Sequence, residues 1–267
     1  MDPEAIKALV FVCVPFPMLY EKYLPLVLEH RLNPEVGLDD GASYQFRWGS
    51  FQRVARILKS EGLKVTIHAP FLEVLPAASD PRIRKVSLDR LTWALKVAEL
   101  FEARSVVCHS GFVPQWYRGE EERWLLTAME SFAYLAEKAE AVGIPLMLEN
   151  VFEPTPELYR RIFEAVSSPY FRFCLDAGHQ KAFAGGDLKD WLKVLGPYIG
   201  QLHLHDNTGH WDDHLPVGAG SVDFEAIFEY LYQRGIRPII TLEPHREEDV
   251  YPSLEGLGRL FKKYPLF

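Results

Sequence analysis

The stretch FRFCLDAGH, residues 171–179, is a largely apolar run that ends in an aspartate, followed three residues later by a histidine. Five further runs have the same form: VTIHAP (65–70), VVCHSG (106–111), LMLENV (146–151), QLHLHD (201–206) and IITLEPH (239–245). Each is typical of a buried strand that ends in a side chain favoured by metals. Because the strands of a parallel α/β barrel all end on one rim, the pattern predicts a barrel with a single site on that rim.

The rest of the chain completes eight strand–helix units. Two more strand-like runs, ALVFVCVP (8–15) and NPEVGL (33–38), precede the six above. Stretches typical of helices lie at about 19–31, 51–61, 82–101, 120–142, 156–166, 188–195, 224–234 and 252–263. We therefore predict an α/β fold, a single (β/α)8 TIM barrel that forms one domain over residues 1–267, with its active site at the C-terminal ends of the strands. The rival open sheet usually has a glycine-rich loop after its first strand, where this chain has VPFPM (14–18).

Composition and charge narrow the range of possible functions. Of the 267 residues, 48% are apolar and 25% are charged, and the formal net charge of −8 argues against a nucleic-acid substrate. No apolar segment is long enough to span a membrane, and the acidic Asp2 and Glu4 argue against a signal peptide. Three widely spaced cysteines, Cys13, Cys108 and Cys174, fit unpaired thiols in a reducing compartment. We expect a cytoplasmic protein that acts on a small molecule, and the sequence leaves its oligomeric state open.

Four strand-end residues form a predicted metal site: Glu149, Asp176, His203 and Glu243. Three carboxylates and one imidazole can hold a divalent ion and leave positions open for substrate oxygens. Two carboxylates beside a chelated hydroxy-ketone can also move a proton to and from carbon. This set alone favours an aldose–ketose isomerase or an epimerase.

The remaining side chains of this kind are His68, His109, His179, Asp212 and His214. The first two end the third and fourth predicted strands, where Glu149 can bridge them to a second ion, and the last three form a further group. Such nitrogen and oxygen ligands suit zinc, with manganese or iron as alternatives. Two or three ions suit phosphoester cleavage, because they generate hydroxide near neutral pH and stabilise the leaving oxygen.

Neighbouring side chains are candidates for substrate binding: Asn150, His205, His210, Trp211, His245 and Arg246. The histidines can contact the substrate or support the metal ligands. Arg246 can meet an anionic group, and Asn150 adjoins Glu149. Trp211, like Trp116 in another predicted rim loop, can stack on a ring of the substrate.

Several segments resemble the xylose isomerase-like TIM-barrel superfamily, which includes endonuclease IV-type enzymes and sugar phosphate isomerases and epimerases. These segments are IHAPF, CHSGF, LENV, CLDAGH, HLHDN, WDDHLPVGAGSVDF and LEPH, between Ile67 and His245. Likeness to endonuclease IV implies three zinc sites: His68, His109 and Glu149; Glu149, Asp176, His203 and Glu243; and His179, Asp212 and His214. Likeness to the epimerases implies only the second site, with Glu149 and Glu243 as the catalytic proton-transfer pair and His179 binding the substrate.

The chain departs from both patterns. Epimerases of this superfamily often have an arginine shortly after the strand-seven histidine, where this chain has Asn207, Thr208 and Gly209. DNA-repair relatives typically have a His-x-Ser loop after the first strand, where this chain has VPFP (14–17). The segments NPEVG and LEPHREEDVYPSLE are similar to cobamide-remodelling phosphodiesterases of the superfamily.

Three functional hypotheses follow from the ligand pattern and the resemblance. The leading one is a metal-dependent phosphoester hydrolase that uses metal-bound hydroxide on a small nucleotide-like or cobamide-like substrate. The alternative is a divalent-metal-dependent sugar or sugar-phosphate isomerase or epimerase. A non-catalytic metal- or sugar-binding barrel is the third, because a fold does not fix a function.

Overall fold

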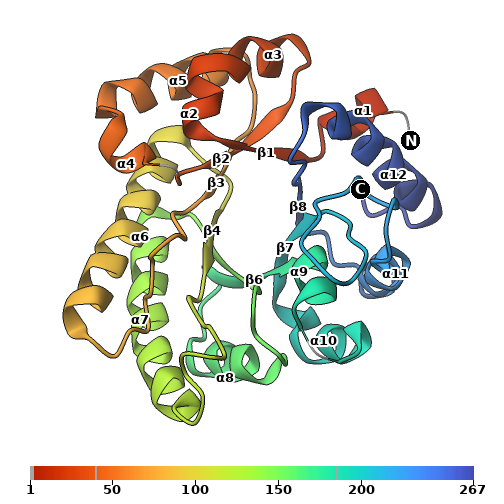
Figure 1. The fold of residues 1–267 in the computed structure, drawn as a ribbon. Coiled ribbons are helices and arrows are strands. Elements are labelled where there is room, and N and C mark those ends of the chain that lie inside the picture. Colours follow the sequence, from red (N-terminus) through yellow and green to blue (C-terminus); the bar gives the residue numbers. More distant parts are fainter. Residues whose placement is uncertain (1–2, 40, 185) are drawn as a thin grey trace.

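The chain folds into a closed barrel of eight parallel strands. The computed structural model describes residues 3–39, 41–184 and 186–267. Neighbouring strands pair in chain order, and β1 closes the ring by pairing with β8 (Figure 1). The strands are β1 (Phe11–Pro15), β2 (Asn33–Gly37), β3 (Thr66–His68), β4 (Val106–His109), β5 (Leu146–Glu149), β6 (Phe171–Asp176), β7 (Ile199–Leu204) and β8 (Ile239–Leu242). The predicted (β/α)8 barrel is confirmed, and the open doubly wound sheet is excluded.

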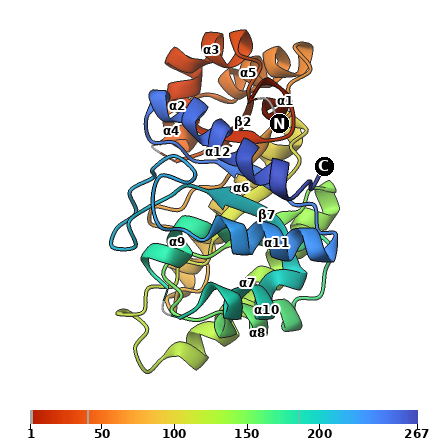
Figure 2. The same cartoon turned by 90° about the vertical axis from the view of Figure 1, so that its right-hand side faces the viewer.

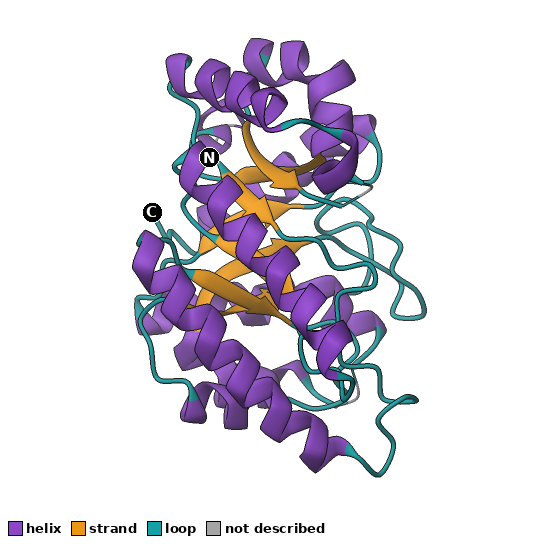
Figure 3. Cartoon of the chain, turned by 90° about the vertical axis from the view of Figure 1, so that its left-hand side faces the viewer, coloured by secondary structure: helices purple, strands orange, loops and turns teal. Residues whose placement is uncertain are grey.

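Helices surround the strands on the outside of the barrel (Figure 3). They are α1 (Pro3–Lys7), α2 (Phe16–Met18), α3 (Leu24–Glu29), α4 (Ala42–Gln45), α5 (Trp48–Ser60), α6 (Pro81–Phe101), α7 (Glu121–Val142), α8 (Glu157–Ala165), α9 (Ala177–Ala182), α10 (Leu188–Leu195), α11 (Phe224–Arg234) and α12 (Val250–Lys263). Two views show α12 next to α1, so the last helix of the ring meets the first (Figures 1 and 2). None of the described helices is long and apolar enough to cross a membrane.

The main apolar core lies between the strands and the helices. On α5, for example, Phe51, Val54 and Leu58 are spaced by three and four residues and are all buried, which is the stripe expected of a helix with one face towards a core. A smaller apolar group, which includes Val107 and Met147, comes from the strands themselves. Burial of this kind stabilises the fold by about 25 cal/mol per Å² of apolar surface.

Local sequence signals set the ends of several helices. Asp80 caps α6 by accepting a hydrogen bond from the backbone N–H of Arg82 at 2.7 Å, and Pro81 occupies the first turn, where its missing N–H is not needed. Asp223 caps α11 in the same way. Gly235 ends α11 at φ +66°, a left-handed conformation that glycine adopts without strain.

The first helical region differs from the single helix predicted at about 19–31. It consists of α2, a π-helical segment η1 (Leu19–Tyr23) and α3. Pro25 lies in the first turn of α3 and has no N–H to donate to the preceding turn, so the regular helical bonding is interrupted there. The short helices α1, α4 and α9 are too brief to produce a periodic signal in the sequence.

Candidate metal centre

The strands lead into long loops at the C-terminal mouth of the barrel (Figure 3). The nine predicted ligands lie at these strand ends and in these loops, linked by contacts of 4.0 Å or less. His68, His109, Glu149 and Asp176 are the last residues of β3, β4, β5 and β6. The register aligns His109 with Glu149 on neighbouring strands. Parallel pairing thus brings residues from distant parts of the sequence to one rim.

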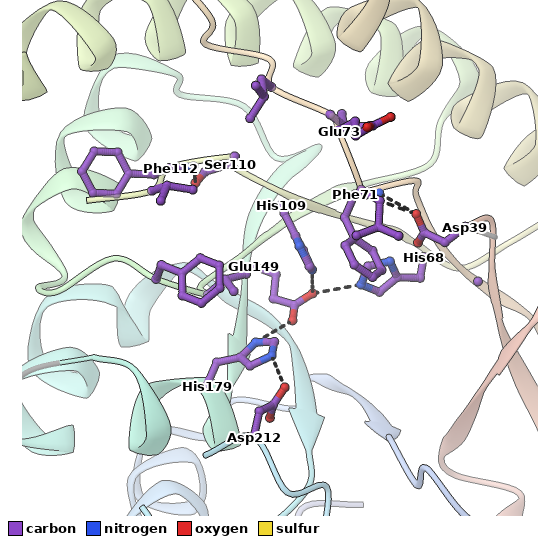
Figure 4. A pocket seen from close by; sticks show the side chains of 18 of the residues that line it. Asp39, His68, Phe71, Glu73, His109, Ser110, Phe112, Glu149, His179 and Asp212 are labelled. Atoms are coloured by element: carbon purple, nitrogen blue, oxygen red, sulfur yellow. Dashed lines mark hydrogen bonds and ion pairs between the residues drawn. The ribbon is translucent and has the colours of Figure 1, made fainter. Parts of the chain in front are cut away.

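Glu149 is the centre of this arrangement, and its side chain is buried. Its Oε2 atom lies 3.2 Å from Nε2 of His68 and 3.2 Å from Nε2 of His109. Its Oε1 atom lies 3.2 Å from Nδ1 of His179 (Figure 4). With His203, whose Nδ1 atom lies 3.4 Å from Oε2, one carboxylate therefore faces four imidazoles, as expected of a ligand that can bridge two metal ions.

The second group consists of Glu149, Asp176, His203 and Glu243, which we call the central set. Nδ1 of His203 lies 3.1 Å from a carboxylate oxygen of Glu243, 3.4 Å from one of Glu149 and 4.0 Å from one of Asp176. All four residues are buried or nearly so. Carboxylates and an imidazole arranged in this way could hold a divalent metal ion.

The third group is larger than predicted. Asp212 Oδ2 lies 3.2 Å from Nε2 of His214 and 3.4 Å from Nε2 of His179, and Asp212 Oδ1 lies 3.5 Å from Nδ1 of His205. Ligand atoms of His179, His205, Asp212 and His214, here called the outer cluster, all lie within 4.8 Å of one another. His205, predicted to contact substrate, is thus placed among potential metal ligands.

Buried polar atoms support metal binding at these groups. Within the described part of the chain, five potential ligand atoms are buried without a hydrogen-bond partner: His109 Nε2, Asp176 Oδ2, His203 Nδ1, His205 Nδ1 and Asp212 Oδ1. Leaving such an atom unsatisfied costs about 1–3 kcal/mol. Zinc ligands lie about 2.1 Å from the ion and hence about 3.4 Å from one another in a tetrahedral site. Most contacts between these groups span 3.1–3.5 Å and fit an ion of this kind, and the contact between His203 and Asp176 is longer, at 4.0 Å.

The electrostatics of the site favour ionised carboxylates. Burial alone would raise the pKa of Glu149, but His203 and His109 outweigh it and hold the pKa well below its usual range. Burial would also raise the pKa of the Asp212 carboxyl group, but His179 and His214 outweigh burial and lower this pKa. The carboxylates are therefore ionised and available to a cation.

Glu35 is a site residue that the sequence analysis missed. It lies on β2 inside the barrel and is fully buried. Its Oε2 atom accepts hydrogen bonds from Thr66, Gln201 and Thr241 at 2.7–3.0 Å, and its Oε1 atom lies 2.9 Å from Nε2 of His203. A carboxylate here favours a proton on Nε2, which leaves the Nδ1 lone pair free for a metal. The only sequence signal is an acidic residue inside the strand-like run NPEVGL.

Asp206 organises the long loop that carries Asp212 and His214. It is buried and accepts backbone hydrogen bonds from Asn207, Gly218, Gly220 and Val222 at 2.8–3.0 Å. A Cβ at Gly220 would lie 2.5 Å from the Asp206 carboxylate, so the close approach requires glycine. The loop then holds His214 with its Nδ1 atom 2.7 Å from the backbone carbonyl oxygen of Glu243.

The predicted substrate-binding residues separate into three kinds. Trp211 and His245 line the pocket above the ligands. The Asn150 side chain instead exchanges two hydrogen bonds with the backbone of Asp176, at 2.9 and 3.0 Å, and so fixes the end of β6. His210 and Arg246 are exposed and do not line the pocket, and Arg246 pairs with Asp249 at 2.9 Å.

The glycine in the DAGH segment has a steric role. A Cβ built on Gly178 would lie 1.9 Å from an atom of the His205 ring. Asp176 accepts a hydrogen bond from the backbone N–H of His179 at 2.6 Å and so starts α9 directly after β6. Within four residues the turn thus provides two potential ligands, Asp176 and His179, and leaves space at Gly178 for the ring of His205.

The fold is an α/β barrel with potential metal ligands at the mouth of the barrel, and comparison with known proteins identifies its class. The family described as "Xylose isomerase-like TIM barrel" matches residues 34–262, and the chain belongs to it. Its members act on small molecules as enzymes, which agrees with the predicted superfamily.

Among curated proteins, the chain is 28% identical to the uncharacterized protein MJ1311 of Methanocaldococcus jannaschii, covering 73% of this chain and 69% of that protein. It is 26% identical to the putative L-ribulose-5-phosphate 3-epimerase SgbU of Escherichia coli K12, covering 66% of this chain and 64% of that protein.

Two solved structures have the same fold. The TTHB071 protein from Thermus thermophilus, soaked with zinc chloride, is 29% identical with a TM-score of 0.80 and covers 96% of this chain and 98% of its own. A D-tagatose 3-epimerase-like protein is 24% identical with a TM-score of 0.83 and the same coverage. The relatives favour isomerase or epimerase chemistry over the phosphoester hydrolysis placed first from sequence.

Proposed function

We propose that the chain is a divalent-metal-dependent isomerase or epimerase of sugar-like hydroxy-ketones, with the central set holding the catalytic ion. The observation that carries the proposal is that Glu149 and Glu243 both approach Nδ1 of His203, at 3.4 and 3.1 Å, and both line the pocket. Two carboxylates therefore converge on one position that suits an ion, and both are also open to the pocket in which a substrate can lie. The similarity to a putative ribulose-phosphate epimerase supports this chemistry.

The ion and the side chains of the site have separate roles in the proposed reaction. A divalent ion, proposed to be zinc with manganese or iron as alternatives, supplies a Lewis acid that makes the C–H beside a carbonyl more acidic. Glu149 takes the proton from one face of the carbon, and Glu243 passes a proton from solvent to the other face, or the reverse. His68 and His109 hold the Glu149 carboxylate in position, each at 3.2 Å.

His179 is suited to bind a substrate oxygen. Its ring lies between two carboxylates, 3.2 Å from Glu149 and 3.4 Å from Asp212 (Figure 4). Burial alone would lower its pKa, but Asp176 and Asp212 outweigh burial and raise it well above the usual value. Both N–H groups of the protonated ring point at the carboxylates of Glu149 and Asp212, so a substrate oxygen would bind by sharing the Nε2–H group with Asp212.

The outer cluster favours a second candidate, the multinuclear phosphoester hydrolase with a small nucleotide-like or cobamide-like substrate. In that case His68, His109 and Glu149 hold one ion, the central set another, and the outer cluster a third, which together suit phosphoester cleavage. The isomerase or epimerase is preferred because a named relative supports it, whereas the hydrolase rests on the number of ligands alone.

Product analysis tests the proposal. Protein loaded with zinc or manganese is incubated with D-fructose, D-tagatose, L-ribulose and their phosphates, and separately with bis(4-nitrophenyl) phosphate. We expect a new sugar by chromatography and no release of 4-nitrophenol. Glu149→Gln and Glu243→Gln should each lower turnover by at least about a hundredfold. Glu255→Gln, at an exposed position of α12, is the matched control and should retain activity.

Metal content of each variant is measured alongside, so that loss of the ion is distinguished from loss of proton transfer. Release of 4-nitrophenol with no sugar product would contradict the proposal in favour of the hydrolase.

A further inference from the structure

The pocket above the metal centre is much larger than a simple sugar requires. It has a volume of about 1290 Å³, compared with about 300–1,000 Å³ for pockets that take drug-sized ligands. His68, His109, Glu149 and Glu243 lie at its base, so the pocket and the metal centre are one continuous site. A ligand whose oxygens reach the metal centre would leave most of the pocket to be filled by something else.

The outer part of the pocket is lined by large apolar side chains. Leu72, Ile83, Val86 and Trp116 come from the loops after β3 and β4 and from the start of α6, and Phe152 and Trp211 come from the loops after β5 and β7. Trp116 is 66% exposed, Trp211 68% and Val86 59%. An apolar surface of this kind, continuous with a polar site, marks a place where an apolar group binds.

Aromatic rings extend this lining down to the ligands. Phe71 stacks on His109 with ring centroids 4.8 Å apart (Figure 4). Phe183 lies 5.7 Å from the ring of His179 and 4.9 Å from that of Phe152. Trp and Phe rings offer flat faces for stacking, so an aromatic group of a ligand would be in contact with rings over much of its surface.

The charges of the pocket disfavour an anionic substituent. Among the described residues that line it, Arg82 is the only lysine or arginine, and it is exposed. Asp39, Glu73 and Glu153 add carboxylates to those of the metal centre. A phosphate bound away from the metal would therefore meet like charges and one solvated guanidinium, whereas sites built for phosphate present several donors.

We propose that the substrate is a neutral sugar-like hydroxy-ketone that carries a bulky apolar group, with an aromatic ring preferred. Its oxygens bind at the metal centre, and the apolar group lies between the Leu72–Trp116 side of the lining and the Phe152–Trp211 side. The sugar-like part of this substrate assignment rests on the proposed function. The apolar part rests on the pocket lining alone.

Three matched ligands test the assignment by titration calorimetry on the zinc-loaded protein: D-fructose, 6-O-benzyl-D-fructose and D-fructose 6-phosphate. We expect the benzyl ether to bind about ten to a hundred times more tightly than D-fructose, because one ring is transferred from water to an apolar wall. The phosphate should bind no more tightly than D-fructose. Equal affinity for the benzyl ether and D-fructose, or tightest binding of the phosphate, would overturn the assignment.

A neutral probe makes the test independent of the sugar. The fluorescence of N-phenyl-1-naphthylamine should rise on binding, and Trp116→Ala combined with Trp211→Ala should weaken its binding at least tenfold. Trp48→Ala is the control, because Trp48 is a partly exposed tryptophan that does not line the pocket. Absence of probe binding, or a dimer in sedimentation that the double variant dissociates, would show that the lining serves another purpose and overturn the assignment.

The experiments distinguish failure of the proposed isomerase or epimerase reaction from failure of the substrate assignment. Benzyl and naphthyl preference without any conversion of hydroxy-ketones would remove the proposed reaction and keep the apolar binding site. Conversion of free ketoses without that preference would keep the reaction and remove the substrate assignment.

Discussion

The buried Glu35 carboxylate lies 2.9 Å from Nε2 of His203, on the side of the ring away from the carboxylates of Glu149 and Glu243. This contact sets which ring nitrogen carries the proton and directs the Nδ1 lone pair into the central set. The buried Glu35 carboxylate, inside the barrel, thus orients His203, a potential metal ligand at the mouth of the barrel.

Replacement of Glu35 is expected to weaken metal binding. Glu35→Ala should raise the dissociation constant for zinc by about 10–100-fold, and Glu35→Gln by less, because an amide still occupies the space but lacks the charge. Competition with a chromophoric chelator measures this. Thr66→Val removes one hydrogen bond to Glu35 without touching His203, and it serves as the control. Unchanged zinc affinity in Glu35→Ala would show that the contact has no positioning role.

The multinuclear hydrolase alternative predicts that the outer cluster holds an ion of its own. Asp212→Asn should lower the metal content by about one ion per chain, because the other residues of the cluster then lack their shared carboxylate. Elemental analysis after gentle purification gives the count. Asp213→Asn is matched in position and chemistry, since Asp213 is exposed and accepts hydrogen bonds from Thr208. Equal metal content in the wild type and Asp212→Asn would contradict this prediction.

Asp206 should be a main determinant of loop stability. Asp206→Ala leaves the backbone N–H groups of Gly218, Gly220 and Val222 without their acceptor, and we expect a loss of about 3 kcal/mol in the free energy of unfolding. Urea denaturation measures the loss. Asp190→Asn, at an exposed position of α10, should change stability by less than about 0.5 kcal/mol. Similar values for the two variants would show that the carboxylate does not organise the loop.

Glu153 gives the stability a defined dependence on pH. Burial raises its pKa, although hydrogen bonds from Ser110, Val151 and Tyr159 act in the opposite direction. Between its usual value of 4.5 and the higher folded-state value, the folded protein keeps a proton that the unfolded chain has released. The free energy of unfolding contributed by this group therefore falls as the pH rises through that window.

Glu153→Gln should remove this component. The variant is expected to lose less stability than the wild type as the pH rises from 4.5 through the window, as measured by urea denaturation at a series of pH values. Parallel curves for the two proteins would mean that Glu153 titrates normally in the folded state.

Much of the site could be predicted because a parallel barrel converts strand ends into neighbours. His68, Glu149 and Asp176 are far apart in sequence, yet each ends a strand, and the topology alone brings them together. Asp212 and His214 lie 3.2 Å apart for a different reason, because the two are separated by one residue in one loop.

The remaining residues depend on side-chain packing that the sequence does not reveal. Glu35 was missed because a carboxylate inside a buried strand is recognisable only once its three hydrogen-bond donors are in place. Asn150 was predicted to contact substrate, but its amide is used by the backbone of Asp176. The order of the functional hypotheses also changed, since a count of ligands does not distinguish the chemistry that they perform.

Solvent deuterium incorporation tests the central claim most directly. Zinc- or manganese-loaded protein is incubated in D₂O with hydroxy-ketones that carry an apolar substituent, and the C–H beside the carbonyl is followed by NMR. The account predicts deuterium at that carbon, dependent on the metal and lost in Glu149→Gln and Glu243→Gln. No incorporation in the metal-loaded protein, together with cleavage of a phosphodiester, would contradict it.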